Sequence, residues 1–230
     1  MPFLEILREY RIFSSVKTQN MSALDLGCGT GDYLVKLPRN SIGIDISLRN
    51  LLLAKNRVRR NLILCDGSSL PFRKDLFDLV FCVNVLHYYD DSKCRRIISE
   101  ANRVLKDGGK LILVVVHSNF PISWRTRDWI KLRLRKKCVW YNFEPNFFTA
   151  NKVRTLLMQT DLVLEQECTN AGTLTVLLGP VISLISKSLR LKIESNKKIL
   201  EFLATMDNLQ KDSVELVFVS RKCHSCRSVK

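Results

Sequence analysis

The sequence contains no apolar run long enough to cross a membrane. Its longest apolar stretch, residues 174–185, is interrupted by glycine, proline and serine, whereas a transmembrane helix needs roughly twenty apolar residues. The first ten residues mix Glu5, Arg8 and Glu9 with apolar side chains, unlike the composition of a signal peptide. We therefore expect a cytoplasmic protein.

The cysteine pattern lacks what a structural zinc site requires. Cys223 and Cys226 form one Cys-x-x-Cys pair, but no second pair of ligands is evident, and structural zinc takes four ligands. The other six cysteines are scattered, and two of them, Cys28 and Cys82, fall in a predicted turn and a predicted buried strand. We therefore predict reduced, mostly buried thiols and no metal site, and we assign no role to the pair.

Acidic residues are scarce relative to basic ones. The chain has 22 Asp and Glu residues against 37 Lys and Arg residues, a formal net charge of +15. Such a charge attracts polyanions, namely RNA, DNA or an anionic membrane surface. A solubility feature, or the charged surface of a thermophile, explains it equally well.

Part of this charge is concentrated between residues 124 and 140, where basic residues alternate with tryptophans. The basic residues are Arg125, Arg127, Lys131, Arg133, Arg135, Lys136 and Lys137. Such a stretch could hold phosphates and stack bases, or lay a helix on an anionic membrane. It is equally typical of a solvated surface helix whose aromatic side chains pack on the domain.

A glycine-rich turn follows the first predicted strand. Residues 23–31 read Ala-Leu-Asp-Leu-Gly-Cys-Gly-Thr-Gly, and glycines suit a turn whose backbone must approach a ligand closely. We expect a helix to begin in residues 32–37 and to direct its unpaired N–H groups toward the same ligand.

The spacing of this turn excludes two phosphate-binding motifs. A dinucleotide fingerprint would have glycine where Asp32 stands, and a P-loop would continue with Gly-Lys-Ser/Thr. A nucleoside ligand without phosphates remains. Asp45, which ends the second predicted strand, is placed to accept the ribose hydroxyls, and Asp66 after the third strand could accept from an adenine amino group.

Five motifs together resemble the class I S-adenosylmethionine-dependent methyltransferases, particularly those acting on small molecules, quinones, lipids and some RNAs. The motifs are residues 24–31, 43–45, 66–72, 77–80 and 105–109. The resemblance implies S-adenosyl-L-methionine as the cofactor. The residues it assigns to the cofactor are Asp25, Gly27, Cys28, Gly29, Gly31, Asp45, Ile46, Asp66, Gly67, Val83 and Asn84.

His87 is the titratable side chain at the exit of the fourth predicted strand. Its ordinary pKa lies near physiological pH, so it is a candidate general base. The alternative is a histidine that packs against the cofactor or a neighbouring loop.

Apolar strands alternate with amphipathic helices over most of the chain, which predicts one α/β domain spanning residues 1–230 with a doubly wound, mostly parallel sheet. The resemblance adds a Rossmann-like sheet of seven strands whose last strand inserts antiparallel between the fifth and sixth. Two insertions are expected: the basic and aromatic segment 119–146, and a helical segment 169–212 before the last strand that would act as a lid or docking surface.

The predicted function is therefore S-adenosylmethionine-dependent methyl transfer. The apolar segment 169–212 and the family resemblance favour a small or lipid-like acceptor. The alternatives are a tRNA or rRNA acceptor, favoured by the basic stretch, and a non-catalytic binding module that retains the fold.

Overall fold

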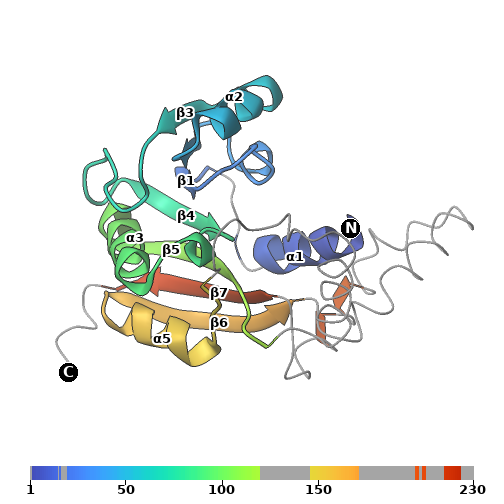
Figure 1. The fold of residues 1–230 in the computed structure, drawn as a ribbon, viewed down its shortest axis with the longest axis vertical. Coiled ribbons are helices and arrows are strands. Elements are labelled where there is room, and N and C mark those ends of the chain that lie inside the picture. The colour runs from blue at the N-terminus through green and yellow to red at the C-terminus, as the bar shows by residue number, and fades with distance from the viewer. Residues whose placement is uncertain are drawn as a thin grey trace, which may run out of the picture.

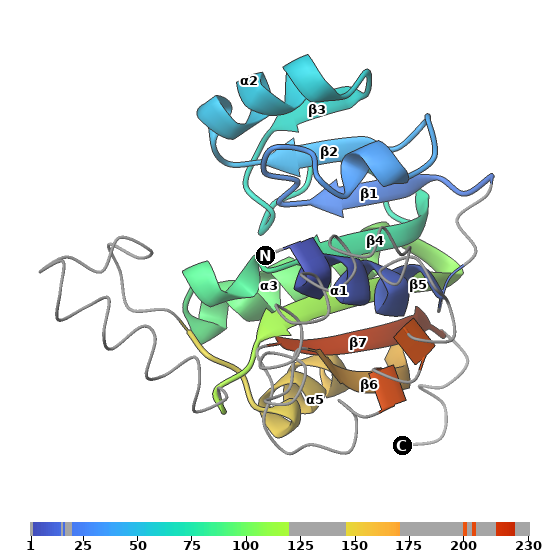
Figure 2. The same ribbon diagram turned by 90° about the vertical axis from the view of Figure 1, so that its right-hand side faces the viewer.

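Seven strands form a single sheet in the computed structural model, which describes residues 2–14, 16, 20–119, 146–170, 200–201, 204–205 and 215–223. The strands are β1 (Ala23–Leu26), β2 (Ile42–Asp45), β3 (Asn61–Leu64), β4 (Phe77–Val83), β5 (Leu105–Val116), β6 (Leu162–Asn170) and β7 (Glu215–Lys222). Figure 2 shows them stacked in the order β3-β2-β1-β4-β5-β7-β6. β7 runs antiparallel to both β5 and β6, whereas β1 to β5 pair in parallel. The expected insertion of the last strand, antiparallel between the fifth and the sixth, is confirmed.

Helices cover both faces of this sheet. They are α1 (Pro2–Ser14), α2 (Leu48–Arg57), α3 (Asp91–Val104) and α5 (Ala150–Met158), drawn in Figure 1. Side chains of α3 and α5 pack in one apolar cluster with strand residues such as Val80 and Leu113. Side chains of α1 and α2 pack in a second cluster with the alternate strand residues Phe81 and Ile112. Because successive strand residues face opposite sides, the sheet is doubly wound, as predicted.

Polar side chains cap the amino ends of two helices. The Ser47 hydroxyl accepts a hydrogen bond from the Asn50 N–H at 3.3 Å and begins α2. The Thr149 hydroxyl accepts from the Lys152 N–H at 3.2 Å and begins α5. Each cap satisfies an N–H group that the first turn of a helix leaves free.

The α-helix expected to begin in residues 32–37 does not form. A single 3₁₀ turn, η1 (Leu34–Lys36), stands in its place, and Leu37 is extended with ψ 163°. Pro38 follows Leu37, and proline disfavours the helical conformation in the residue before it. No α-helix therefore follows the glycine turn directly, contrary to the sequence-based expectation.

Both predicted insertions lie almost wholly outside the described residues. This applies to all seven basic residues of the stretch 124–140. It applies also to the helical segment 169–212, of which residues 169–170, 200–201 and 204–205 are described. At the edge of the second segment, Thr169 and Asn170 belong to β6. Within the described ranges, none of the helices is long and apolar enough to cross a membrane.

Candidate cofactor site

The candidate site lies at the carboxyl edge of the sheet, where ligands bind in open α/β folds. The turn after β1 contains three glycines with left-handed backbone angles, at φ 74° for Gly27, 53° for Gly29 and 85° for Gly31. The N–H groups of Gly27 and Cys28 donate to the Ile44 carbonyl at 2.9 and 2.8 Å. The end of β2 therefore anchors the turn that leaves β1.

Gly27 and Gly29 serve different steric purposes. A Cβ on Gly27 would lie 2.4 Å from Cγ2 of Val85, which is closer than real side chains approach. A Cβ on Gly29 would meet nothing within 4 Å, so the space above that residue is open. Gly27 thus allows the turn to pack against the loop after β4, and Gly29 leaves an open surface that a ligand can approach.

Asp45, at the end of β2, organises the same turn. One carboxylate oxygen accepts from the Gly29 N–H at 2.9 Å, and the other accepts from the Ser47 N–H at 2.8 Å and from Asn50 Nδ2 at 3.4 Å. The carboxylate therefore fixes the open part of the glycine turn against the start of α2. Contact between Asp45 and a ribose stays a prediction.

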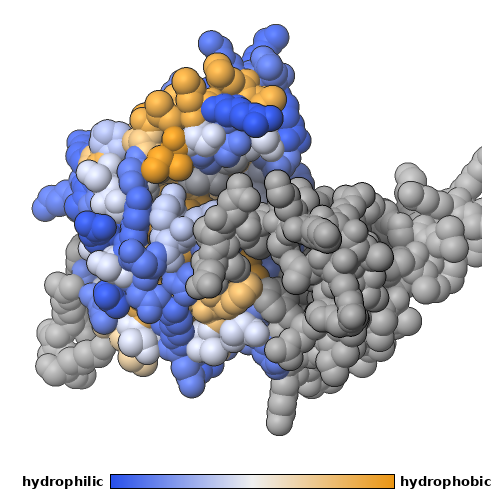
Figure 3. Space-filling view, viewed as in Figure 1, coloured by the Kyte–Doolittle hydropathy of each residue, from blue (hydrophilic) through white to orange (hydrophobic). Residues whose placement is uncertain are grey.

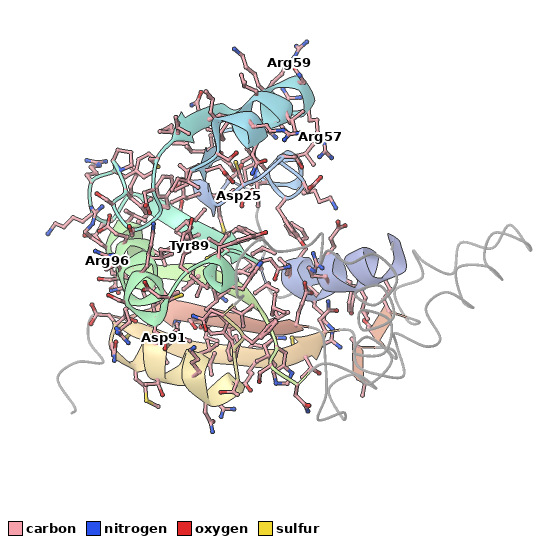
Figure 4. The ribbon with its side chains drawn as sticks, viewed as in Figure 1. Asp25, Arg57, Arg59, Tyr89, Asp91 and Arg96 are labelled. Atoms are coloured by element: carbon pink, nitrogen blue, oxygen red, sulfur yellow. The ribbon has the colours of Figure 1, made fainter. Side chains whose placement is uncertain are left out.

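Asp25 is a buried carboxyl group inside β1, 2% exposed, and Figure 4 shows it in the interior near the glycine turn. Burial, reinforced by the negative charges of Asp45 and Asp32, raises the pKa of Asp25 to about 7, against the opposing hydrogen bond from the Leu34 N–H. In the described part of the chain its Oδ2 atom has no hydrogen-bond partner. An unpaired buried acceptor is costly, and an ammonium group such as that of a methionine moiety would satisfy it.

The pKa of Asp25 predicts how stability depends on pH. Between pH 4 and 7 the folded protein retains a proton that the unfolded chain has lost, so stability falls as pH rises through that window. Asp25→Asn removes this term. The free energy by which the variant exceeds the wild type in unfolding should therefore grow by a few kcal/mol as the pH rises from 5 to 8. Urea unfolding of both ligand-free proteins measures this, and an equal pH dependence would contradict the assignment.

Asp66 already has partners for both of its oxygens. Lys93 Nζ donates to Oδ2 at 2.7 Å, and the Ser68 N–H and hydroxyl donate to Oδ1 at 2.9 and 2.8 Å. Burial opposes ionisation, but these hydrogen bonds outweigh it and hold the pKa of Asp66 below its ordinary value. A hydrogen bond from adenine would therefore have to be shared with Lys93 or Ser68, and it stays a prediction.

The remaining predicted cofactor residues surround the same edge. Cys28 is buried, and burial raises the pKa of its thiol well above the ordinary value. Ile46 follows Asp45 and is exposed. Gly67 lies in the loop after β3 and packs against Leu26 of β1. A Cβ added to Gly67 would lie 3.0 Å from Cδ2 of Leu26. Val83 ends β4 and is half-buried. Their contacts with a cofactor stay predictions.

His87 lies in the short 3₁₀ turn η2 (Leu86–Tyr88) and is 3% exposed. Burial lowers the pKa of His87 to about 4, although the charge of Glu215 opposes this effect. At neutral pH the imidazole is therefore uncharged and a weak base. The proposed catalytic role of His87 stays a prediction, and this pKa is poorly matched to general-base catalysis near neutrality.

A buried carboxylate at this edge was missed by the sequence analysis. Glu215 begins β7 and accepts hydrogen bonds from Arg8 on α1, from Asn84 after β4, and from Asn170 at the end of β6. The signal in the sequence is a single acidic residue within the apolar strand Glu-Leu-Val-Phe-Val. The sequence gives no indication of its partners, because they lie 45 to 207 residues away.

Comparison with known proteins identifies the family of this site. Residues 24–113 match the model of the methyltransferase domain. The chain is 38% identical over 93 residues to the human protein called probable tRNA methyltransferase 9B, a match covering 40% of this chain and 20% of that protein. It is 35% identical over 94 residues to the Xenopus tropicalis tRNA (carboxymethyluridine(34)-5-O)-methyltransferase alkbh8, covering 40% of this chain and 15% of that protein.

Solved structures extend the likeness to nearly the whole chain. A methyltransferase solved in complex with the Trm112 methyltransferase activator of Haloferax volcanii aligns over 95% of this chain and 89% of its own, with TM-score 0.64 and 16% identity. The curated relatives are longer, since the chain spans less than half the length of each. Residues 24–113 thus belong to the methyltransferase domain family, and the chain has the fold of the class I S-adenosylmethionine-dependent methyltransferases.

Proposed function

We propose that the protein transfers a methyl group from S-adenosylmethionine to an oxygen of a modified uridine in tRNA. The observation that carries this proposal is the similarity of the chain, over 93 and 94 residues, to proteins named as tRNA methyltransferases, together with its net charge of +15. Positive charge attracts tRNA whatever its sequence and makes binding dependent on salt. The acceptor atom is taken from the name of the Xenopus relative.

When bound, S-adenosylmethionine supplies a methyl group activated by a sulfonium. The glycine turn and Asp45 would hold the nucleoside part of the cofactor, and Asp25 would accept a hydrogen bond from its ammonium group. A carboxylate oxygen of the uridine substituent would supply the electron pair of the new O–CH₃ bond as the S–CH₃ bond breaks, with S-adenosylhomocysteine as the second product. The main task of the protein is to align these groups.

The chemistry of this acceptor agrees with the environment of His87. A carboxylate is already deprotonated at neutral pH, so no general base is needed. Burial lowers the pKa of His87 to about 4, which makes the imidazole a weak base. The small or lipid-like acceptor favoured by the sequence rests mainly on segment 169–212, which lies almost wholly outside the described residues.

Purified tRNA incubated with the protein and S-adenosylmethionine tests the proposal. After digestion, mass spectrometry should find a uridine derivative heavier by one methylene, and mild alkali should remove the methyl group because it is held as an ester. Raising the salt concentration should weaken tRNA binding steeply. Label in lipid or small molecules, with none in tRNA, would contradict the tRNA assignment.

We further propose that a small activator protein binds the β3 edge of the sheet. Exposed apolar side chains gather there, on the surface over α2 and β3 that is orange in Figure 3. They are Ile46, Leu48, Leu52, Leu53 and Leu64, each 47–57% exposed. In the described part of the chain β3 pairs with β2 alone, so its outer edge can accept a strand from another protein.

The character of the partner follows from two observations. The methyltransferase of similar fold was solved with the Trm112 activator. Figure 4 shows Arg57 and Arg59 at the outer end of α2, so a partner with an acidic rim around an apolar centre would complement this surface.

Co-expression with the Trm112-type protein of the same organism tests this proposal. Leu52→Glu should abolish co-purification, because it places a charge in the apolar centre of the surface. Met158→Glu is the matched control, since Met158 is 68% exposed on α5, at the opposite side of the sheet. Equal co-purification of both variants would contradict the proposed surface.

A further inference from the structure

The cluster around Glu215 joins four elements at the carboxyl edge of the sheet. Glu215 begins β7, Asn170 ends β6, Asn84 follows β4, and Arg8 lies on α1. Glu215 is 3% exposed, and a buried carboxylate is retained at little cost only when several donors satisfy it. None of these four residues belongs to the glycine turn, and the cluster includes neither Asp45 nor Asp66.

The hydrogen bonds of Glu215 determine how two amide side chains point. Its Oε1 accepts from Asn84 Nδ2 at 2.7 Å, and its Oε2 accepts from Asn170 Nδ2 at 2.8 Å and from Arg8 Nε at 2.7 Å. An ionised carboxylate can only accept hydrogen bonds, so each amide must turn its nitrogen toward Glu215. The Oδ1 atoms of both asparagines consequently point away from Glu215.

These two amide oxygens are buried and have no hydrogen-bond partner within the described ranges. The Asn170 side chain is itself 1% exposed. Leaving a buried acceptor unsatisfied costs roughly 1–3 kcal/mol. Two such acceptors, both on residues that donate to Glu215, therefore require an explanation. A ligand that brings N–H or O–H groups to this edge would satisfy them.

The backbone of Asn84 supports a functional role for this position. Asn84 has a left-handed φ of 55°, and its N–H donates to the Val114 carbonyl at 2.9 Å. Strained backbone positions of this kind cluster at ligand sites. The backbone of Asn84 is thus held by β5, and its side chain is held by Glu215 of β7.

Arg8 connects the cluster to the glycine turn. Besides its ion pair with Glu215, its Nη1 donates to the Tyr33 hydroxyl at 3.3 Å, and Tyr33 lies two residues after Gly31. In Figure 1 α1 lies beside the carboxyl end of β4. Through Arg8, Glu215 therefore holds α1 over the edge of the sheet where cofactor and acceptor must meet.

We propose that Glu215 is a positioning residue for the methyl acceptor, whose N–H or O–H groups are bound by the amide oxygens of Asn84 and Asn170. The acceptor is of a class that carries hydrogen-bond donors on the same nucleoside as the reacting oxygen, such as the imide N–H of the uridine base. This inference rests on the proposed function. It assigns the amide oxygen of Asn84 to the acceptor, whereas the family resemblance assigned Asn84 to the cofactor.

Glu215→Gln tests the inference, because glutamine has the shape of glutamate but only one oxygen. It can therefore accept from the amide nitrogen of Asn84 or from that of Asn170, but not from both as they are now oriented. The KM for tRNA should rise about tenfold or more, as expected when one or two hydrogen bonds to the acceptor are lost. The Kd for S-adenosylhomocysteine should stay within about twofold, because the glycine turn and Asp45 are untouched. Glu167→Gln is the control: it alters the Arg154–Glu167 ion pair, which joins α5 to β6.

Four outcomes are distinguishable. A raised KM with unchanged cofactor affinity and thermal stability supports the positioning role. A parallel loss of cofactor affinity and stability would show a purely structural ion pair, and unchanged kinetics would show no role at all, so either overturns the inference. If the wild-type protein binds cofactor but neither binds nor methylates tRNA, the proposed function fails, and the inference fails with it.

Discussion

Gly27→Ala is expected to reduce the affinity for S-adenosylmethionine by at least about 100-fold. The new Cβ would lie 2.4 Å from Cγ2 of Val85, and the residue would have to keep φ at 74°. Left-handed backbone costs roughly 1–2 kcal/mol for a residue with a Cβ, and Val85 belongs to the apolar cluster beneath the sheet edge and cannot move freely. The turn must therefore shift, and the surface that faces the cofactor shifts with it.

Gly108→Ala is the matched control for backbone strain. Gly108 has φ 75°, nearly the same as Gly27, but a Cβ there would meet nothing within 4 Å. It lies in β5, near the amino end of that strand and away from the glycine turn. This variant should lose roughly 1 kcal/mol of stability and keep its cofactor affinity in calorimetric titration. Equal affinities for both variants would mean that the turn does not bind the cofactor.

Asp45→Ala is expected to have an effect of similar size on cofactor affinity. The substitution removes the acceptor of the Gly29 N–H and the Ser47 N–H. It also removes the carboxylate predicted to accept the ribose hydroxyls. Losing charge-assisted hydrogen bonds of this kind costs about 1.5–3 kcal/mol each, so affinity for S-adenosylhomocysteine should fall at least about 100-fold.

Asp78→Asn separates this effect from general damage to the fold. Asp78 accepts from the Ser22 N–H and hydroxyl at 2.8 and 2.6 Å and pairs with Lys106, so it too organises neighbouring segments. It lies near the start of β4, at the edge of the sheet opposite the glycine turn. Its substitution should lower thermal stability and leave the cofactor affinity unchanged. An unchanged affinity in Asp45→Ala would show that Asp45 does not serve the cofactor.

Most of the fold was predictable from the sequence because local patterns specify it. The alternation of apolar strands with amphipathic helices predicted the doubly wound, mostly parallel sheet. The position of β7 between β5 and β6 could not be derived from periodicity, since strand pairing is a long-range property. Only the family resemblance supplied it.

Two features of the structure were not predicted, one for a local reason and one for a long-range reason. The segment after the glycine turn has apolar residues near helical spacing, but Leu37 precedes a proline and the helix does not extend beyond one 3₁₀ turn. The Glu215 cluster was missed for a different reason. Its members come from α1, β4, β6 and β7, and no short motif links side chains so far apart in the chain.

Transfer of radiolabelled methyl from S-adenosylmethionine into a host extract tests the central claim most directly. The extract is separated into RNA, protein, lipid and small molecules, and Asp45→Ala and Asp78→Asn are assayed beside the wild-type protein. The account predicts label in the tRNA of the wild-type and Asp78→Asn reactions, and none with Asp45→Ala. Absence of label from every fraction, together with absence of cofactor binding by the wild-type protein, would contradict the methyltransferase activity itself.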